Sequence, residues 1–139
     1  MYRKLNFEVM SDTQRCYETI PELMSAVEWS IENQFMVREE DNIVLPETNK
    51  IETRYIVSGK RSFEAAKDYK GKKVAVLNYA NNVAIGGAPY SAGAQEESLC
   101  RYSTLLPCLQ AMKEPFYSRK HSGNTTSCSF GRRWHCLIF

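Results

Sequence analysis

A short apolar segment, followed by a pair of glycines, constrains the fold of this chain more than any other feature. Residues 74–79 read Val-Ala-Val-Leu-Asn-Tyr, and such a continuous apolar run is typical of a strand covered on both faces. Gly86 and Gly87 come next, and segment 95–106 then has the pattern of a helix. One side of that helix is predicted to carry Leu99, Tyr102, Ser103 and Leu106. A strand, a loop and a helix in this order predict an α/β fold.

The segment before this unit is predicted to be mainly helical. Ser11-Asp12 offers an N-cap for a helix over 13–20, which Pro21 interrupts, and a second helix is predicted over 22–37. The apolar face of the second helix, at 3.6-residue spacing, comprises Leu23, Ala26, Val27, Ser30, Ile31 and Phe35. Trp29 and Met36 lie off that face, so the second helix is expected to be covered on more than one side.

Shorter elements are predicted around the strand. Residues 54–57 have the composition of a second strand, and Ser62 is placed to cap a short helix over 63–69. Pro107 should kink or end the helix that begins at residue 95, because proline has no N–H to donate to the preceding turn. The sequence contains no visible internal repeat.

Composition indicates a single small domain without strong electrostatic preferences. At 139 residues the chain has the size of one domain, and its 18 basic and 16 acidic side chains give no argument for nucleic acid or membrane. No signal peptide is expected, and no window approaches the roughly 18 apolar residues of a membrane span. The five cysteines lack a CxxC pair, which favours free thiols in a reducing cytoplasm, or in the nucleus if the source is eukaryotic.

One late cluster has the residue types of a zinc site. It consists of His121, Cys128, His135 and Cys136. Zinc ligands usually come in pairs a few residues apart, and here only the adjacent pair at 135–136 is close, where neighbours rarely point at one ion. The spacing therefore favours incidental thiols, and we expect neither a metal nor a cofactor.

Two adjacent carboxylates, Glu96 and Glu97, stand in the first turn of the helix that follows the glycines. A glycine-containing loop that leads into a helix can bind a diphosphate, and nearby carboxylates can then act on the attached sugar. Consecutive helical residues diverge by about 100°, so only one carboxylate can face a given bond. The combination indicates a nucleotide-sugar site.

A simpler interpretation explains the same residues without a ligand. Acidic side chains in a first helical turn are stabilised by the helix dipole, and the glycines would form an ordinary turn. Glu97 and Arg101 also have the i,i+4 spacing of a surface ion pair.

The segment from Leu77 to Leu109 resembles the microbial-type poly(ADP-ribose) glycohydrolases. It reads LNYANNVAIGGAPYSAGAQEESLCRYSTLLPCL, whereas that family has a Gly-Gly-Gly loop followed a few residues later by Gln-Glu-Glu. The resemblance implies a macrodomain-like three-layer α/β/α fold with a mixed sheet, preceded by a helical N-terminal segment. It also implies ADP-ribose or poly(ADP-ribose) on modified proteins as the partner, with no direct binding to nucleic acid or membrane. Oligomeric state does not follow from it.

The same resemblance implies roles for individual residues. Glu97 would be the catalytic acid/base and Glu96 would hold ribose hydroxyls. The substrate-binding positions would be Gln95, which supports the carboxylates, Asn81 at the ribose, and Gly86, Gly87 and Ala88 at the diphosphate. Ala88 stands where the family has its third glycine, and Ile85 replaces a usual proline.

The end of the chain departs from the family pattern. From about residue 118 the sequence follows neither a helical nor a strand period and crowds turn formers with thiols. We therefore expect one domain over 1–139, with a helical accessory segment at 1–50, a core at 51–117 and a divergent or truncated tail at 118–139, so that the sheet is incomplete.

Three functions are consistent with these residues. The first is hydrolysis of ribose glycosidic bonds in poly(ADP-ribose) or ADP-ribosylated protein, which releases ADP-ribose. The second is ADP-ribose binding without catalysis, and the third is an inactive fragment of such an enzyme.

Overall fold

The computed structural model describes residues 2–35, 44, 52–81, 84–111 and 134–138, which form helices and a small sheet. The helices and strands in chain order are α1 (Tyr2–Thr19), α2 (Pro21–Asn33), α3 (Ser62–Lys67), β1 (Ala75–Tyr79), α4 (Gln95–Tyr102), α5 (Leu105–Ala111) and β2 (Trp134–Ile138). This combination of helices with strands agrees with the α/β class predicted from the sequence.

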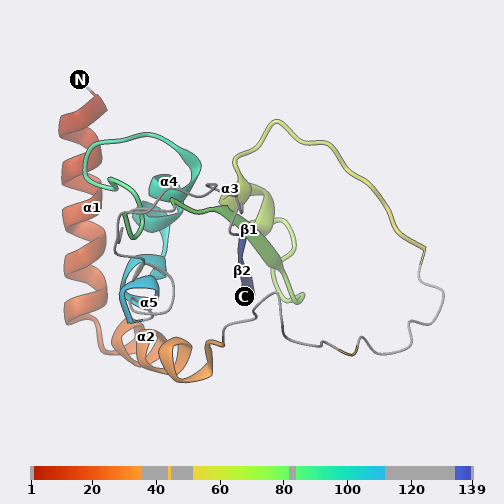
Figure 1. The fold of residues 1–139 in the computed structure, drawn as a ribbon, viewed down its shortest axis with the longest axis horizontal. Coiled ribbons are helices and arrows are strands. Elements are labelled where there is room, and N and C mark those ends of the chain that lie inside the picture. The colour runs from red at the N-terminus through yellow and green to blue at the C-terminus, as the bar shows by residue number, and fades with distance from the viewer. Residues whose placement is uncertain (1, 36–43, 45–51, 82–83, 112–133, 139) are drawn as a thin grey trace, which may run out of the picture.

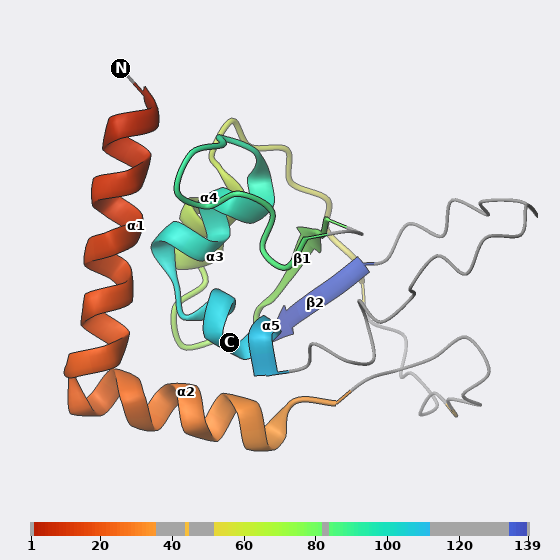
Figure 2. The ribbon, with the colours of Figure 1, turned by 60° about the vertical axis from the view of Figure 1, so that its left-hand side comes forward.

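The N-terminal helices α1 and α2 meet at a sharp bend and lie along two sides of the molecule (Figures 1 and 2). Pro21 is the first residue of α2, a position where its missing N–H would have no helical partner. The predicted N-cap at Ser11-Asp12 is wrong, because α1 begins at residue 2 and runs through both residues. The longer helix brings Met10 into the core, where it is completely buried.

The core lies in the angle between α1 and α2, where α4 and α5 pack (Figures 1 and 2). Its buried apolar residues are Met10, Val76, Leu99, Cys100, Leu105, Leu106 and Leu109. Burial of apolar side chains of this size contributes roughly 1.5–3 kcal/mol each to the free energy of unfolding. The core therefore joins α1 to α4, α2 to α5, and α4 to β1.

The second N-terminal helix is much more exposed than its apolar face predicts. None of the residues of α2 is buried, and Trp29 is 65% exposed. Of the predicted apolar face, Leu23, Val27 and Ser30 are half-buried, whereas Ala26, Ile31 and Phe35 are exposed, so the prediction holds only in part. The predicted extension of this helix to residue 37 is wrong, because α2 ends at Asn33 and the backbone of Gln34 is extended.

Strand β1 begins one residue later than predicted and pairs with β2 in an antiparallel ladder, with Leu77 opposite Cys136. β2 lies in the tail segment that the sequence marked as divergent. The described sheet has these two strands. The prediction of a strand covered on both faces is wrong for this structure: burial alternates along β1, and Leu77 and Tyr79 are 42% and 61% exposed. Successive side chains of a strand point to opposite faces, so only the face with Val76 and Asn78 reaches the core.

The predicted helix 95–106 is two helices, α4 and α5. The break falls at Ser103, whose backbone is extended. The Ser103 hydroxyl donates a hydrogen bond to the Leu99 carbonyl (2.8 Å) and accepts one from the Leu105 N–H (3.2 Å). Pro107 lies in the first turn of α5, where proline is tolerated, and so does not cause the break. Tyr102 was predicted to share the buried side with Leu99, but it is 55% exposed.

Two smaller predictions are also corrected. Residues 54–57 form no strand and are exposed in the structure. Helix α3 begins at Ser62 itself, and Arg61 occupies the N-cap position, with its N–H bonded to Glu64 Oε2 at 3.2 Å. No helix among the described residues is long and apolar enough to cross a membrane.

Candidate active site

Gln95, the first residue of α4, fastens the helix to the end of β1. Its Oε1 accepts a hydrogen bond from the Tyr79 N–H (2.9 Å), and its Nε2 donates to the Leu77 carbonyl (2.6 Å). A third contact, at 3.3 Å, joins Nε2 to the Ser62 hydroxyl. The side-chain amide therefore pairs with β1 much as a neighbouring strand would. This pairing fixes where the two following carboxylates lie.

Glu96 is buried, at 2% exposure, against the end of β1. Its Oε1 accepts from Asn78 Nδ2 (3.1 Å) and its Oε2 from the Asn81 N–H (2.7 Å). Burial raises the pKa of Glu96 above its ordinary value, the two hydrogen bonds oppose that rise, and the adjacent Glu97 adds to it. Each carboxylate oxygen has two acceptor directions, so Glu96 retains capacity for a further donor.

Asn78 is the buried partner of Glu96 and was not predicted from the sequence. It is completely buried, and its Oδ1 has no hydrogen-bond partner among the described residues. A signal was present, because a polar residue within an otherwise apolar strand needs a partner when it faces the core.

Glu97 is also buried, but it points to a different part of the chain. Its Oε1 accepts from the Ala88 N–H at 3.2 Å, and within the described residues its other oxygen accepts no hydrogen bond. The two adjacent carboxylates therefore have separate partners, as the divergence of consecutive helical residues predicts. Glu96 is fixed at both oxygens, whereas Glu97 is fixed at one.

The glycine loop joins β1 to α4 (residues 80–94), and two of its glycines pack closely against side chains of α4 and α5. Gly86 and Gly87 have φ values of 69° and 65°, in the left-handed region that favours glycine. A Cβ added at Gly87 would lie 2.3 Å from Glu97 Oε1, and one added at Gly86 would lie 2.7 Å from Leu106 Cδ1. A Cβ at either position could enter only if the neighbouring side chain shifted, a reason for glycine that the sequence did not reveal.

Several polar groups of the glycine loop already have protein partners. The Gly87 N–H donates to the Ala84 carbonyl (3.1 Å), and the Ala88 N–H is bonded to Glu97. Asn81, predicted to contact ribose, is exposed and accepts from the Ala84 N–H through its Oδ1 (2.9 Å). Residues 82–83 lie outside the described part of the loop.

Arg101 holds the far end of the glycine loop. Its guanidinium donates to the carbonyls of Pro89 (2.6 Å) and Ala92 (2.7 Å), and the residue is 7% exposed. The surface ion pair between Glu97 and Arg101 that the spacing suggested is not formed, since both residues are buried and no ion pair joins them. Local spacing gave no signal for this role.

Helix α1 braces the same part of the loop from the other side. Asn6 Nδ2 donates to the Ser91 and Ala92 carbonyls (both 3.2 Å), and the Tyr90 hydroxyl bonds to Gln14. The Phe7 and Tyr90 rings are 5.7 Å apart between centroids. The loop is therefore held between α1 and α4.

No group of three or more possible metal ligands occurs among the residues whose side chains are described. Of the cluster considered for zinc, His121 and Cys128 lie outside the described residues, and nothing is described of the other two side chains. The described thiols Cys16, Cys100 and Cys108 are free.

A family model for the microbial-type PARG (poly(ADP-ribose) glycohydrolase) catalytic domain matches residues 9–130. The chain belongs to this family. The resemblance noted from the motif is thereby confirmed, and the match covers α1 from residue 9 onward as well as the strand, loop and α4. Membership in a PARG catalytic-domain family points to a glycosidase, a class of hydrolase. No curated protein and no solved structure matches the chain.

The structure brings most of the predicted site residues of this PARG family member together around the start of α4, whereas Gly86 lies against Cys100 and Leu106. Glu96 meets the backbone of Asn81, and Glu97 meets Gly87 and Ala88. Gln95 contacts β1 rather than either carboxylate. Sequence reasoning missed Asn78 and Arg101.

Proposed function

We propose that this chain hydrolyses ribose glycosidic bonds in poly(ADP-ribose) or ADP-ribosylated protein and so releases ADP-ribose. The observation that carries the proposal is the position of Glu97, whose carboxylate is buried on the glycine loop with one oxygen held by Ala88 and the other uncommitted. A carboxyl group that is oriented at one oxygen and open at the other suits proton transfer. Family membership supports the reaction class.

In the proposed reaction Glu97 acts first as an acid and then as a base. Protonated Glu97 gives its proton to the departing ribose oxygen while the bond from that oxygen to the anomeric carbon breaks. The bonding electrons leave with the oxygen, and the sugar gains oxocarbenium character. A water molecule then attacks the anomeric carbon and loses a proton to the Glu97 carboxylate, which restores the acid.

Glu96 has the proposed role of holding ribose hydroxyls. The two hydrogen bonds from Asn78 and Asn81 fix the direction of its carboxylate, which favours a positioning role over proton transfer. Asn81 would contribute to the same ribose, and Gln95 would act indirectly by fixing the helix on β1. The contacts of Glu96 and Gln95 in this chain thus support the roles that the family resemblance implies.

The glycine loop is proposed to bind the diphosphate through Gly86, Gly87 and Ala88. Backbone N–H groups in a loop with left-handed glycines can face an anion. Because Gly87 and Ala88 already use their N–H groups within the protein, a diphosphate would have to share or replace these bonds. Binding of a diphosphate to the loop would therefore also change the hydrogen bond that the Ala88 N–H donates to Glu97.

The larger architecture that we propose is the macrodomain-like three-layer plan, with residues 1–50 as an accessory segment and 118–139 as a divergent tail. The contacts of α1 with the glycine loop support an accessory role for the N-terminal segment. A cytoplasmic setting is proposed from the free thiols.

The proposal is tested by Glu97→Gln, with Glu28→Gln on the exposed face of α2 as the matched control. Release of ADP-ribose from a poly(ADP-ribosyl)ated protein is expected to fall about 100-fold or more in Glu97→Gln, because general acid–base groups contribute about 10²–10⁴-fold. Calorimetric binding of ADP-ribose should remain in both variants. Equal release by Glu97→Gln and the unmodified chain would refute the assigned role.

A second function, ADP-ribose binding without hydrolysis, is favoured by one observation. The Ala88 N–H is engaged by Glu97, and Ala88 adds a methyl group where the family has glycine. Binding of ADP-ribose without any release would establish this function. If the chain neither binds ADP-ribose nor releases it from the polymer, it is an inactive fragment.

A further inference from the structure

A cavity of about 380 Å³ lies beside the candidate active site, between α3 and the start of α4. Its wall includes Arg61, Phe63, Lys67, Gln95, Ser98 and Tyr102. Cavities of roughly 300 Å³ or more are large enough for small organic ligands. Glu96 and Glu97 do not line this cavity, although Gln95, which fixes α4 on β1, does.

The cavity and the carboxylates occupy different faces of α4. Gln95, Ser98 and Tyr102 are spaced by three and four residues and therefore lie on one side of the helix. Glu96 and Glu97 are buried on other sides, against β1 and the glycine loop. A ligand in the cavity would touch the same helix as the substrate without competing for the same atoms.

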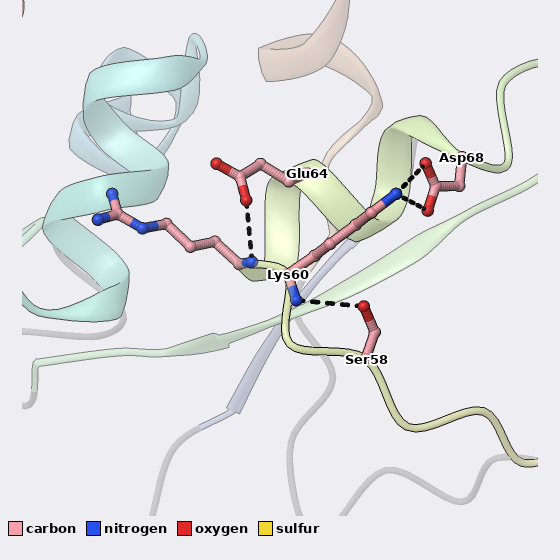
Figure 3. A network of polar contacts seen from close by, with 5 residues as sticks. Ser58, Lys60, Glu64 and Asp68 are labelled. Atoms are coloured by element: carbon pink, nitrogen blue, oxygen red, sulfur yellow. Dashed lines mark hydrogen bonds and ion pairs between the residues drawn. The ribbon is translucent and has the colours of Figure 1, made fainter.

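The charges around the cavity are not all committed. Lys60, which also lines the cavity, is paired with both carboxylate oxygens of Asp68, at 2.8 and 2.6 Å, and Figure 3 shows its side chain reaching to Asp68 at the end of α3. Glu64 accepts from the Arg61 backbone N–H, as the dashed line from its carboxylate in Figure 3 shows. No carboxylate of the described residues forms an ion pair with the Arg61 guanidinium.

Two aromatic side chains, Phe63 and Tyr102, line the same cavity as Arg61 and Lys67. The Lys67 ammonium stands 5.2 Å from the centre of the Phe63 ring, and Tyr102 is 55% exposed at the cavity. An unpaired guanidinium binds phosphate oxygens well, and an exposed tyrosine ring can stack on a base. Ser98 and Gln95 also line the cavity, as do the charged residues Lys60 and Glu64.

We propose that this cavity binds a nucleoside monophosphate unit, with Arg61 and Lys67 on the phosphate and Tyr102 on the base. Its identification as the AMP portion of a neighbouring unit in a poly(ADP-ribose) chain rests on the proposed function. In that setting the site holds the polymer while the adjacent unit lies at Glu97. The site is a polymer-positioning subsite, and it takes no part in bond cleavage.

The test is a titration of the complete, isotope-labelled chain with AMP, followed by backbone NMR. Binding is expected to shift amide signals of residues 61–67 and 95–102 more than those of residues 84–88. Arg61→Ala should weaken AMP binding about tenfold or more, whereas Arg54→Ala, at an exposed arginine away from the cavity, should leave it unchanged. Ser98→Trp fills the cavity and should abolish the AMP shifts. Circular dichroism checks that each variant is folded.

The outcomes separate this proposal from the proposed hydrolase. AMP shifts confined to residues 84–88, no AMP shifts at all, or unchanged affinity in Arg61→Ala would overturn the second site. Inorganic phosphate that binds as tightly as AMP would overturn its nucleoside part. Failure of the hydrolase proposal shows instead as no release of ADP-ribose, and Glu97→Gln should leave AMP binding at the cavity intact in either case.

Discussion

Gly87 offers the sharpest test of the contact between the glycine loop and Glu97. Its φ of 65° lies in the left-handed region, and a Cβ at this position would lie 2.3 Å from Glu97 Oε1 and 2.8 Å from Glu97 Cδ. Real Cβ atoms do not approach other atoms so closely, so Gly87→Ala must displace the carboxylate. The substitution therefore imposes both backbone strain and the loss of the bond from Ala88 to Glu97.

The two costs can be estimated separately. A left-handed backbone costs a residue with a side chain about 1–2 kcal/mol relative to glycine. A buried polar group deprived of its partner costs about 1–3 kcal/mol. Gly87→Ala should therefore lower the free energy of unfolding by about 2–5 kcal/mol.

The chain provides two matched controls. Gly71 has a φ of 81° with nothing within 4 Å of an added Cβ, so Gly71→Ala should show the backbone cost alone. Gly93 has neither a left-handed φ nor a neighbour within 4 Å, and Gly93→Ala should be neutral or stabilising by about 0.4–1 kcal/mol. The difference between Gly87→Ala and Gly71→Ala isolates the contact with Glu97.

The assay is urea unfolding followed by circular dichroism, with the free energy of unfolding taken from the midpoint and slope. The double variant Gly87→Ala/Glu97→Ala removes the colliding side chain and should be less destabilised than the sum of the two single variants. If Gly87→Ala and Gly71→Ala are equally destabilising, Glu97 does not rest on the loop, and the central premise of the proposed site fails.

Three further predictions follow from buried groups. Because the pKa of Glu96 is raised above its ordinary value of 4.5, the folded state binds more protons than the unfolded state above that pH. The stability that this group contributes is therefore present below pH about 4.5 and is lost as pH rises through the raised pKa. In urea unfolding at several pH values, Glu96→Gln should remove this decrease in the free energy of unfolding, whereas Glu28→Gln should not. Arg101→Met leaves the Pro89 carbonyl without a donor and the Ala92 carbonyl with Asn6 alone, and should lower the free energy of unfolding by about 1–3 kcal/mol. Arg101→Lys should be less damaging, and equal stability of both variants and the unmodified chain would contradict the role of Arg101 in holding the loop. Burial and, to a smaller extent, the neighbouring carboxylates raise the pKa of the Cys100 thiol to about 12. After iodoacetamide treatment, mass spectrometry should therefore find the half-buried Cys16 alkylated well before Cys100. Early labelling of Cys100 would contradict its placement in the core.

The parts of the site that the sequence predicted are those encoded within a short stretch. Strand β1 and the start of α4 lie within one residue of their predicted positions, because apolar composition and helix-start signals act locally. The separation of Glu96 from Glu97 also follows from helix geometry alone. Burial of Leu77, Tyr79 and Tyr102 was mispredicted, since periodicity gives the faces of an element but not which face another element covers.

The residues that hold the loop could not be predicted, because their partners are distant in sequence. Thr13 donates to the Arg101 carbonyl across 88 residues, and Asn6 reaches Ala92 across 86. No periodic or spacing rule connects positions so far apart, and Arg101 taken locally suggests a surface pair with Glu97. The carboxylates and glycines thus supply the chemistry from one short segment, whereas α1 and Arg101 supply the rigidity that orients it. Since proton transfer requires a fixed distance between the acid and the leaving oxygen, activity should depend on these remote contacts as well as on Glu97.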